Sequence, residues 1–131
     1  MRARELAVMV AVLGGALAYA AAQESALSYA KDVEPLFVAE CGDCHSAENP
    51  KKGLDLSQGR GVANMLDRPS QEVDGVLLLK AGDPAASYLW QKLTHAAAEG
   101  KGMPRTMFGA KKLSQDQLDL IERWISEGAK P

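Results

Sequence analysis

The chain has 131 residues, which is enough for one modest domain and too few for two. Hydrophobic residues make up 47% of the sequence and charged residues 24%, the proportions of an ordinary soluble domain. The formal net charge of -2 argues against nucleic acid as the main partner. Only 5% of the residues are aromatic, which is few for a domain whose core is filled by side chains alone.

Residues 1–22 have the pattern of a secretory signal peptide. Two arginines precede an uncharged run that ends in small residues. We expect cleavage after Ala22, with Ala20 as the alternative, and therefore a periplasmic location. An uncleaved membrane anchor is the other interpretation, but the run is short for a span and rich in glycine and alanine. Cleavage removes two of the 15 basic and one of the 17 acidic residues, so the mature chain has a formal charge of -3.

The remaining chain is predicted to be a flexible lead-in at 23–27 and a single domain at 28–131. Its first helix is expected to run into the cysteines, with Asp32 as the N-cap and Pro35 in the first turn, where its missing N–H costs little. The apolar stripe that predicts this helix consists of Val33, Leu36 and Phe37.

The middle of the chain mixes loops with short elements. Residues 50–75 are rich in turn-forming residues and predict loops around one helical turn at 62–66. The apolar run at 76–79 is expected to be a short buried extended piece. A helix is predicted from Pro84 to about Ala98, capped by Asp83. Its buried stripe would be Tyr88, Leu89 and Leu93, with Trp90 near the edge.

Residues 100–109 are expected to be a glycine-rich loop. After it, Ser114 and Gln117 form a capping box that predicts the start of a C-terminal helix, flanked by a hydrophobic staple of Leu113 and Leu118. Gly128 lies where a C-terminal stop is expected. The buried face of this helix would consist of Leu118, Ile121, Trp124 and Ile125.

The chain's two cysteines and one of its two histidines form a Cys-x-x-Cys-His motif at Cys41, Cys44 and His45. A dithiol oxidoreductase would need the cysteines at the start of a helix, usually on a βαβ scaffold, and the sequence shows no such alternation. A structural zinc site needs four ligands, and only His95 remains to supply the fourth. Both interpretations are therefore disfavoured.

Attachment of a haem gives each residue of the motif a role. Two cysteines form thioethers with the porphyrin vinyl groups, and the histidine after the second cysteine lies beneath the iron. The motif thus predicts one covalently bound haem c per chain, with His45 as the proximal ligand. A haem in the core would also account for the small number of aromatic side chains.

Several blocks of the sequence resemble the planctomycete-type branch of class I c-type cytochromes. The resemblance covers residues 29–129, and its most specific elements are the cysteine motif, Gly82-Asp83-Pro84, Met103-Pro104 and the Trp124-Ile125 pair with Gly128-Ala129. The matching blocks are "DVEPLFVAECGDCHS", "KKGLDLS", "AGDPAASYLWQKL", "MP" and "KKLSQDQLDLIERWISEGA".

The resemblance implies an all-α class I cytochrome c fold, in which N- and C-terminal helices cross around the covalently bound haem and long loops connect the elements. It implies a distal methionine ligand before a proline, which maps onto Met103. Met107 lies in the same loop and is the second choice. Met65 is expected to pack in the core. His95 is expected to end a helix, where a cationic imidazole interacts favourably with the helix dipole.

These observations predict a periplasmic carrier of single electrons, with His45 and Met103 as iron ligands and with no catalytic residues, so not an enzyme. Its expected partners are a periplasmic dehydrogenase as donor and an oxidase or reductase as acceptor, with no nucleic acid and no stable membrane insertion after cleavage. The alternative is a haem domain with an open or displaceable sixth position that binds a small gas or peroxide.

Residues 100–113 contain four basic residues and no acidic residue. If this loop covers the distal face, it would steer an acidic partner toward the haem edge. A solvated loop with no such role is the alternative interpretation. The basic residues are Lys101, Arg105, Lys111 and Lys112.

Overall fold

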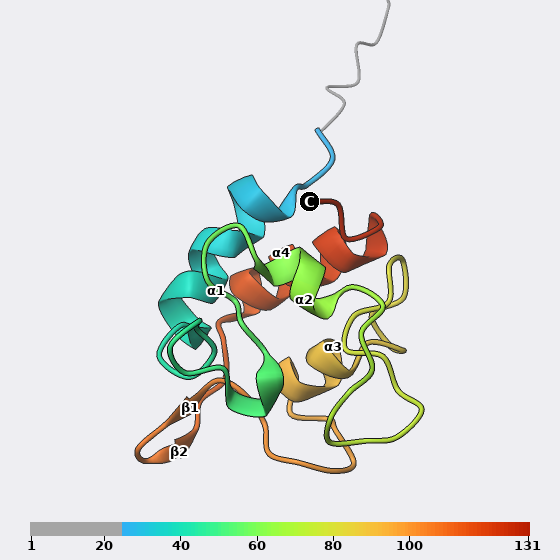
Figure 1. Cartoon of the computed structure of the whole chain (residues 1–131). Coiled ribbons are helices and arrows are strands. Elements are labelled where there is room, and N and C mark those ends of the chain that lie inside the picture. Colours follow the sequence, from blue (N-terminus) through green and yellow to red (C-terminus); the bar gives the residue numbers. More distant parts are fainter. Residues whose placement is uncertain (1–24) are drawn as a thin grey trace, which may run out of the picture.

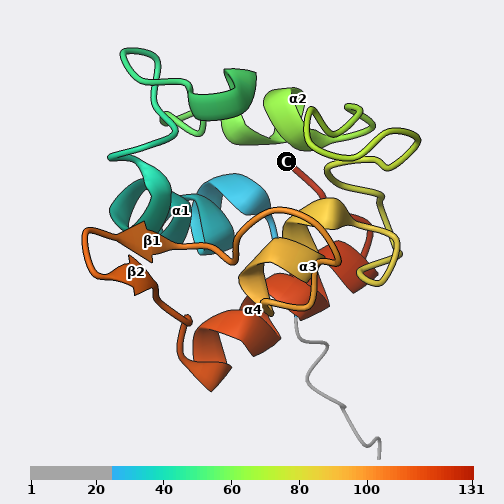
Figure 2. The same cartoon turned by 90° about the horizontal axis from the view of Figure 1, so that it is seen from below.

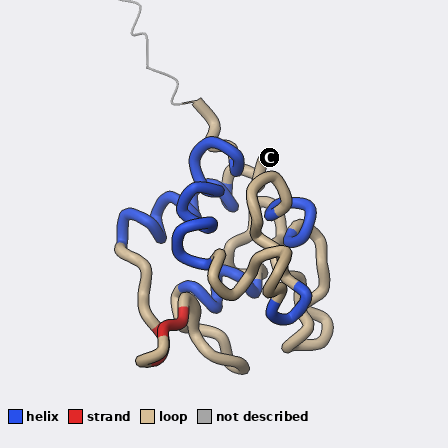
Figure 3. Tube along the Cα trace, turned by 60° about the vertical axis from the view of Figure 1, so that its left-hand side comes forward, coloured by secondary structure: helices blue, strands red, loops and turns tan. Residues whose placement is uncertain are grey.

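The computed structural model describes residues 25–131, so the predicted signal peptide lies outside the described residues. Short helices and long loops make up most of this region, as Figures 1 and 3 show. In chain order the elements are the π-helical turn η1 (Tyr29–Val33), α1 (Glu34–Cys41), the 3₁₀ turn η2 (Lys51–Gly53), α2 (Gly61–Met65), α3 (Tyr88–Leu93), β1 (Arg105–Thr106), β2 (Gly109–Ala110) and α4 (Gln115–Ser126).

The prediction of an all-α fold is confirmed only in part, because the structure also contains a small antiparallel sheet. Strands β1 and β2 pair within and just beyond the segment predicted to be a loop, with Arg105 opposite Ala110 and Thr106 opposite Gly109. The Thr106 hydroxyl stabilises the turn, because its oxygen accepts from the Phe108 N–H at 3.2 Å and donates to the Gly109 carbonyl at 3.2 Å. The structure is therefore mainly helix and loop with one short hairpin.

The first helical segment begins earlier than predicted. Ser28, in an extended conformation, is the N-cap of η1, and its side chain accepts from the Lys31 N–H. Asp32 instead accepts from the Ser28 N–H at 2.8 Å, one turn after the cap. The helical path continues into α1, where Pro35 lies in the first turn as expected.

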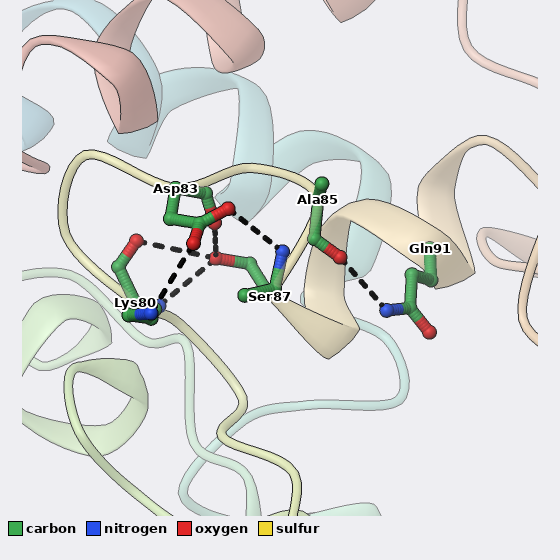
Figure 4. Close-up of polar contacts among 6 residues, drawn as sticks. Lys80, Asp83, Ala85, Ser87 and Gln91 are labelled. Atoms are coloured by element: carbon green, nitrogen blue, oxygen red, sulfur yellow. Dashed lines mark hydrogen bonds and ion pairs between the residues drawn. The ribbon is translucent and has the colours of Figure 1, made fainter.

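Helix α3 is much shorter than the predicted helix from Pro84 to Ala98. Asp83 does cap a turn, since its Oδ1 accepts from the Ala86 N–H at 3.0 Å, but that turn closes separately. Ser87 is fully buried and extended, and its hydroxyl donates to the Asp83 carbonyl at 2.8 Å. Figure 4 shows these contacts between the turn and the start of α3. The helix therefore begins only at Tyr88.

Two other predictions for the middle of the chain are confirmed. Helix α2 is the single helical turn expected near 62–66. The run at 76–79 is extended and forms isolated bridges, in which Leu79 pairs with Leu66 and Leu77 pairs with both Pro69 and Ser87. Leu79 has no exposed surface, so this extended piece reaches the core.

The N- and C-terminal segments lie side by side (Figure 1). The Tyr29 N–H and the Trp124 Nε1–H both donate to the Lys130 carbonyl, at 2.8 and 2.9 Å. The Tyr29 and Trp124 ring centroids are 5.4 Å apart. Helix α4 has the predicted capping box between Ser114 and Gln117. Its buried face consists of Ile121, Trp124 and Ile125, with Leu118 packed at the edge.

No helix within residues 25–131 is both long enough and apolar enough to cross a membrane.

Candidate haem site

The cysteine motif lies at the C-terminal end of α1. Cys41 is the last residue of this helix. The N–H groups of Cys44 and His45 both donate to the Cys41 carbonyl, at 3.1 and 3.0 Å. The chain therefore turns tightly after the helix and places the three side chains of the motif close together.

Two adjoining cavities open beside this turn, with volumes of about 440 and 320 Å³. Both are lined by Cys41, His45, Lys51 and Met103, and the larger one also by Cys44. The smaller cavity has an apolar wall, and the two volumes fall in the range of cavities that hold small molecules and cofactors. The residues of that wall are Leu54, Leu56, Leu78 and Leu89.

Met103 and Met107 differ in their surroundings. Met103 is partly buried, packs against the core and lines both cavities. Its N–H donates to the Lys92 carbonyl at the end of α3, at 3.0 Å. Met107 lines only the larger cavity and is 89% exposed. Met65, which was expected to pack in the core, has no exposed surface and belongs to the core cluster.

His45 is held in the form that binds a metal. Its Nδ1 lies 3.1 Å from the Lys51 carbonyl, which only accepts hydrogen bonds, so Nδ1 carries the proton. The Nε2 lone pair is then available to a ligand. Burial lowers the pKa of the imidazole, which favours the neutral form. A backbone carbonyl on the second nitrogen is a common way to orient a histidine ligand.

The two thiols do not have the properties of a reactive dithiol. Both cysteines are free, and burial, assisted by the nearby Glu40 carboxylate, raises the pKa of the Cys41 thiol to about 12. A catalytic thiol needs a lowered pKa, usually at a helix N-terminus, whereas Cys41 ends α1. Within residues 25–131 no three histidine, cysteine or acidic side chains are grouped to hold a metal ion. The geometry therefore disfavours both the dithiol and the zinc interpretations.

The chain was compared with known protein families. The family model described as Planctomycete cytochrome C matches residues 41–105, a segment that begins at Cys41 and ends just after Met103. The chain belongs to the planctomycete-type cytochrome c family. No curated protein and no solved structure matches it. Membership indicates electron transfer through a covalently bound haem.

The residues that line the two cavities of this cytochrome fit a covalently bound haem. Cys41 and Cys44 line one cavity together, which suits two thioether bonds to one edge of a porphyrin. His45 has a neutral imidazole with Nε2 available, and the leucine wall described above offers an apolar surface to a flat macrocycle.

His95 does not occupy the helix end predicted for it. Helix α3 ends at Leu93, and His95 follows the C-cap residue Thr94 with a left-handed φ of 60°. Its Nε2 lies 3.1 Å from the Met103 carbonyl, and it lines neither cavity. The His95 imidazole therefore contacts the loop that carries Met103.

A buried charged cluster in the wall of the smaller cavity was not anticipated from the sequence. Lys92, only 6% exposed, places its Nζ 2.7 Å from Glu72 Oε2. The single Tyr88 O–H is shared between two acceptors, the same carboxylate oxygen at 3.1 Å and the Glu99 backbone carbonyl at 3.0 Å. The only available signal was the i, i+4 spacing of Tyr88 and Lys92, because Glu72 is distant in sequence.

Glu72 makes the stability of the cytochrome pH-dependent. Its hydrogen bond with the Lys92 ammonium holds the pKa of the carboxyl below its ordinary value. The stabilising contribution is thus fully present above the unfolded-state pKa of about 4.3 and is lost as the pH falls through the folded-state value. We expect Glu72→Gln to lower the free energy of unfolding at pH 7 by about 1–3 kcal/mol, because Lys92 loses its partner.

Denaturant unfolding at pH 7 and pH 3 measures this effect. The difference between wild type and Glu72→Gln should shrink at pH 3, because this pH lies below the unfolded-state pKa and part of the stabilising contribution of the carboxylate is then lost. Glu99→Gln is the control, because the Glu99 side chain is exposed and only the backbone carbonyl of this residue contacts the cluster. A difference of equal size at both pH values would contradict the role of the Glu72 charge.

Proposed function

We propose that this protein carries single electrons on one covalently attached haem c. Cys41 and Cys44 would form the thioethers, His45 would be the proximal ligand and Met103 the distal ligand. The observation that carries the proposal is that Met103, which is distant in sequence from the cysteine motif, lines the same two adjoining cavities as Cys41 and His45. The bound haem would supply the one-electron chemistry, and we propose no catalytic residue.

Each proposed ligand has support from its surroundings. The Lys51 carbonyl orients the His45 ring, with Nε2 available for the iron. A thioether is a soft, neutral donor, and His/Met ligation raises the reduction potential relative to two histidines. Met103 is preferred over Met107 because it lines both cavities, whereas Met107 is 89% exposed.

A methionine that fills the sixth position also excludes exogenous ligands. The alternative function, binding of a small gas or peroxide, needs that position to be open or easily vacated. Titration of the reduced protein with carbon monoxide at neutral pH distinguishes the two. We expect no binding on mixing, and rapid stoichiometric binding would instead support the alternative.

The location proposed for this carrier is the periplasm. The proposal rests on the signal pattern at 1–22, and it implies no stable membrane insertion after cleavage. A periplasmic dehydrogenase would then be the electron donor and an oxidase or reductase the acceptor. The mildly negative mature chain gives no reason to expect nucleic acid as a partner.

The charge of the surface around the hairpin suits binding of an acidic redox partner. Lys101, Arg105 and Lys112 are exposed, while Lys111 forms an ion pair with Glu40 at 2.9 Å. The positive charge is thus smaller than the four basic residues predict. The hairpin also presents two of the most exposed large hydrophobic side chains among residues 25–131, Met107 at 89% and Phe108 at 94%. Of these residues, Arg105 and Met107 also line the larger cavity, so basic and apolar side chains lie beside it.

Small charged oxidants test this local positive charge. We expect oxidation of the reduced protein by the hexacyanoferrate(III) anion to slow as ionic strength rises from about 0.01 to 0.5 M, even though the mature chain is negative overall. Lys112→Glu should flatten this dependence, because it removes positive charge near the hairpin. The control, Lys31→Glu, makes the same charge change on η1. Equal salt dependence in the two variants would contradict local steering.

A further inference from the structure

The segment that precedes Met103 is held along the side of α3 (Figure 2). At its beginning, the Glu99 carbonyl accepts from the Tyr88 hydroxyl at 3.0 Å. At its end, the Met103 N–H donates to the Lys92 carbonyl at 3.0 Å. The loop is therefore tied to the helix at two points before any contact from His95 is considered.

His95 supplies a third attachment, to the other backbone group of Met103. Its Nε2 lies 3.1 Å from the Met103 carbonyl, and because a carbonyl only accepts, Nε2 is the donor. The left-handed φ of 60° at His95 turns the chain away from the helical path as α3 ends. Both backbone polar groups of Met103 are thus bonded to residues at the C-terminal end of α3.

The ring of His95 also packs closely on the loop. A Cβ added at Gly102 would lie 2.5 Å from His95 Cγ, so the imidazole lies against the backbone of the residue before Met103. A side chain at Gly102 would push the ring or the loop away. The contact is therefore both a hydrogen bond and a close packing arrangement, and it needs glycine at this position.

We propose that His95 is a positioning residue that holds the Met103 sulfur in the haem cavity. This inference rests on the proposed role of Met103 as distal ligand. Opening of the loop is one way for the sulfur to leave the cavity, and this motion of the Met103 backbone breaks the bond to His95 and its contact with Gly102. The attachment to His95 therefore opposes displacement of the methionine by an external ligand.

Imidazole binding to the oxidised, haem-loaded protein at pH 7 tests the inference. His95→Leu removes the donor but keeps an apolar side chain, and we expect imidazole to bind about fivefold more tightly, because one hydrogen bond no longer opposes opening of the loop. His95→Gln keeps an N–H donor and should stay within about twofold of wild type. Asp67→Leu is the matched control, since Asp67 is exposed and also has a left-handed φ, of 54°.

The outcomes separate this inference from the proposed function. If wild-type protein has the weak far-red band of methionine on ferric haem, and His95→Leu binds imidazole no more tightly than wild type and Asp67→Leu, the role of His95 is wrong. A shift of the unfolding midpoint without a change in imidazole affinity would likewise leave His95 a merely structural residue. If wild type itself lacks the far-red band, Met103 is not the ligand and the proposed function fails first.

Discussion

Replacement of Met103 by leucine is expected to abolish the far-red band of the oxidised protein and to let the reduced protein bind carbon monoxide. The proposed sixth ligand is lost, while leucine keeps a side chain of similar volume in the cavities that Met103 lines. Loss of the thioether, which favours ferrous iron, should lower the reduction potential by on the order of 0.1 V, within the ~0.8 V range that axial ligands control. Optical spectra and a redox titration measure these changes.

Met107→Leu is the matched control for this prediction. Met107 lies in the same hairpin region and lines the larger cavity, but it is 89% exposed. Its replacement should leave the far-red band, the carbon monoxide behaviour and the potential as in wild type. Loss of the band in Met107→Leu, with the band retained in Met103→Leu, would reassign the distal ligand to Met107.

Replacement of Trp124 by alanine is expected to cost about 3–5 kcal/mol in the free energy of unfolding. Trp124 is fully buried, its ring centroid lies 5.4 Å from that of Tyr29, and its Nε1–H donates to the Lys130 carbonyl. The indole therefore links α4 to both η1 and the C-terminal segment. Urea unfolding of the haem-loaded protein measures the change.

Two further variants show which part of Trp124 matters. Trp124→Phe keeps a ring against Tyr29 but leaves the Lys130 carbonyl without the indole donor, and it should cost about 1–2 kcal/mol. Phe108→Ala, at a side chain 94% exposed, should stay within about 0.5 kcal/mol of wild type. A Trp124→Ala variant as stable as Phe108→Ala would show that the contact between the terminal segments contributes little.

The parts of the fold that the sequence predicts well are those fixed by neighbouring residues. The capping box between Ser114 and Gln117 needs only a spacing of three residues, and α4 begins where it predicts. The Cys-x-x-Cys-His motif is equally local, because its tight turn after α1 follows from consecutive residues. Such signals depend little on the rest of the chain.

Helix α3 and the hairpin were mispredicted because their bounds depend on other contacts. The Asp83-Pro84 pair is a good helix start locally, yet the buried Ser87 hydroxyl bonds to Asp83 and separates that turn from the helix. Strands β1 and β2 have two residues each, which is too short for any alternation of apolar and polar residues to show.

The side chains around the candidate site were predicted only in part. The cysteines, His45 and Met103 carry recognisable chemistry and a recognisable order. The pairing of Lys92 with Glu72 and the contact of His95 with Met103 join residues from different segments, and no spacing rule predicts them. The left-handed turn at His95, which breaks the helical pattern, is also invisible to a periodicity argument.

The mass and optical spectrum of the exported protein under denaturing conditions test the central claim most directly. The protein would be produced in a host with haem-attachment machinery and compared with a Cys41→Ala, Cys44→Ala double variant. The account predicts that the wild-type polypeptide keeps a mass increase of one haem and a c-type spectrum after unfolding, and that the double variant has neither. A wild-type protein with the mass of the polypeptide alone, or one that loses its haem on unfolding, would contradict the claim.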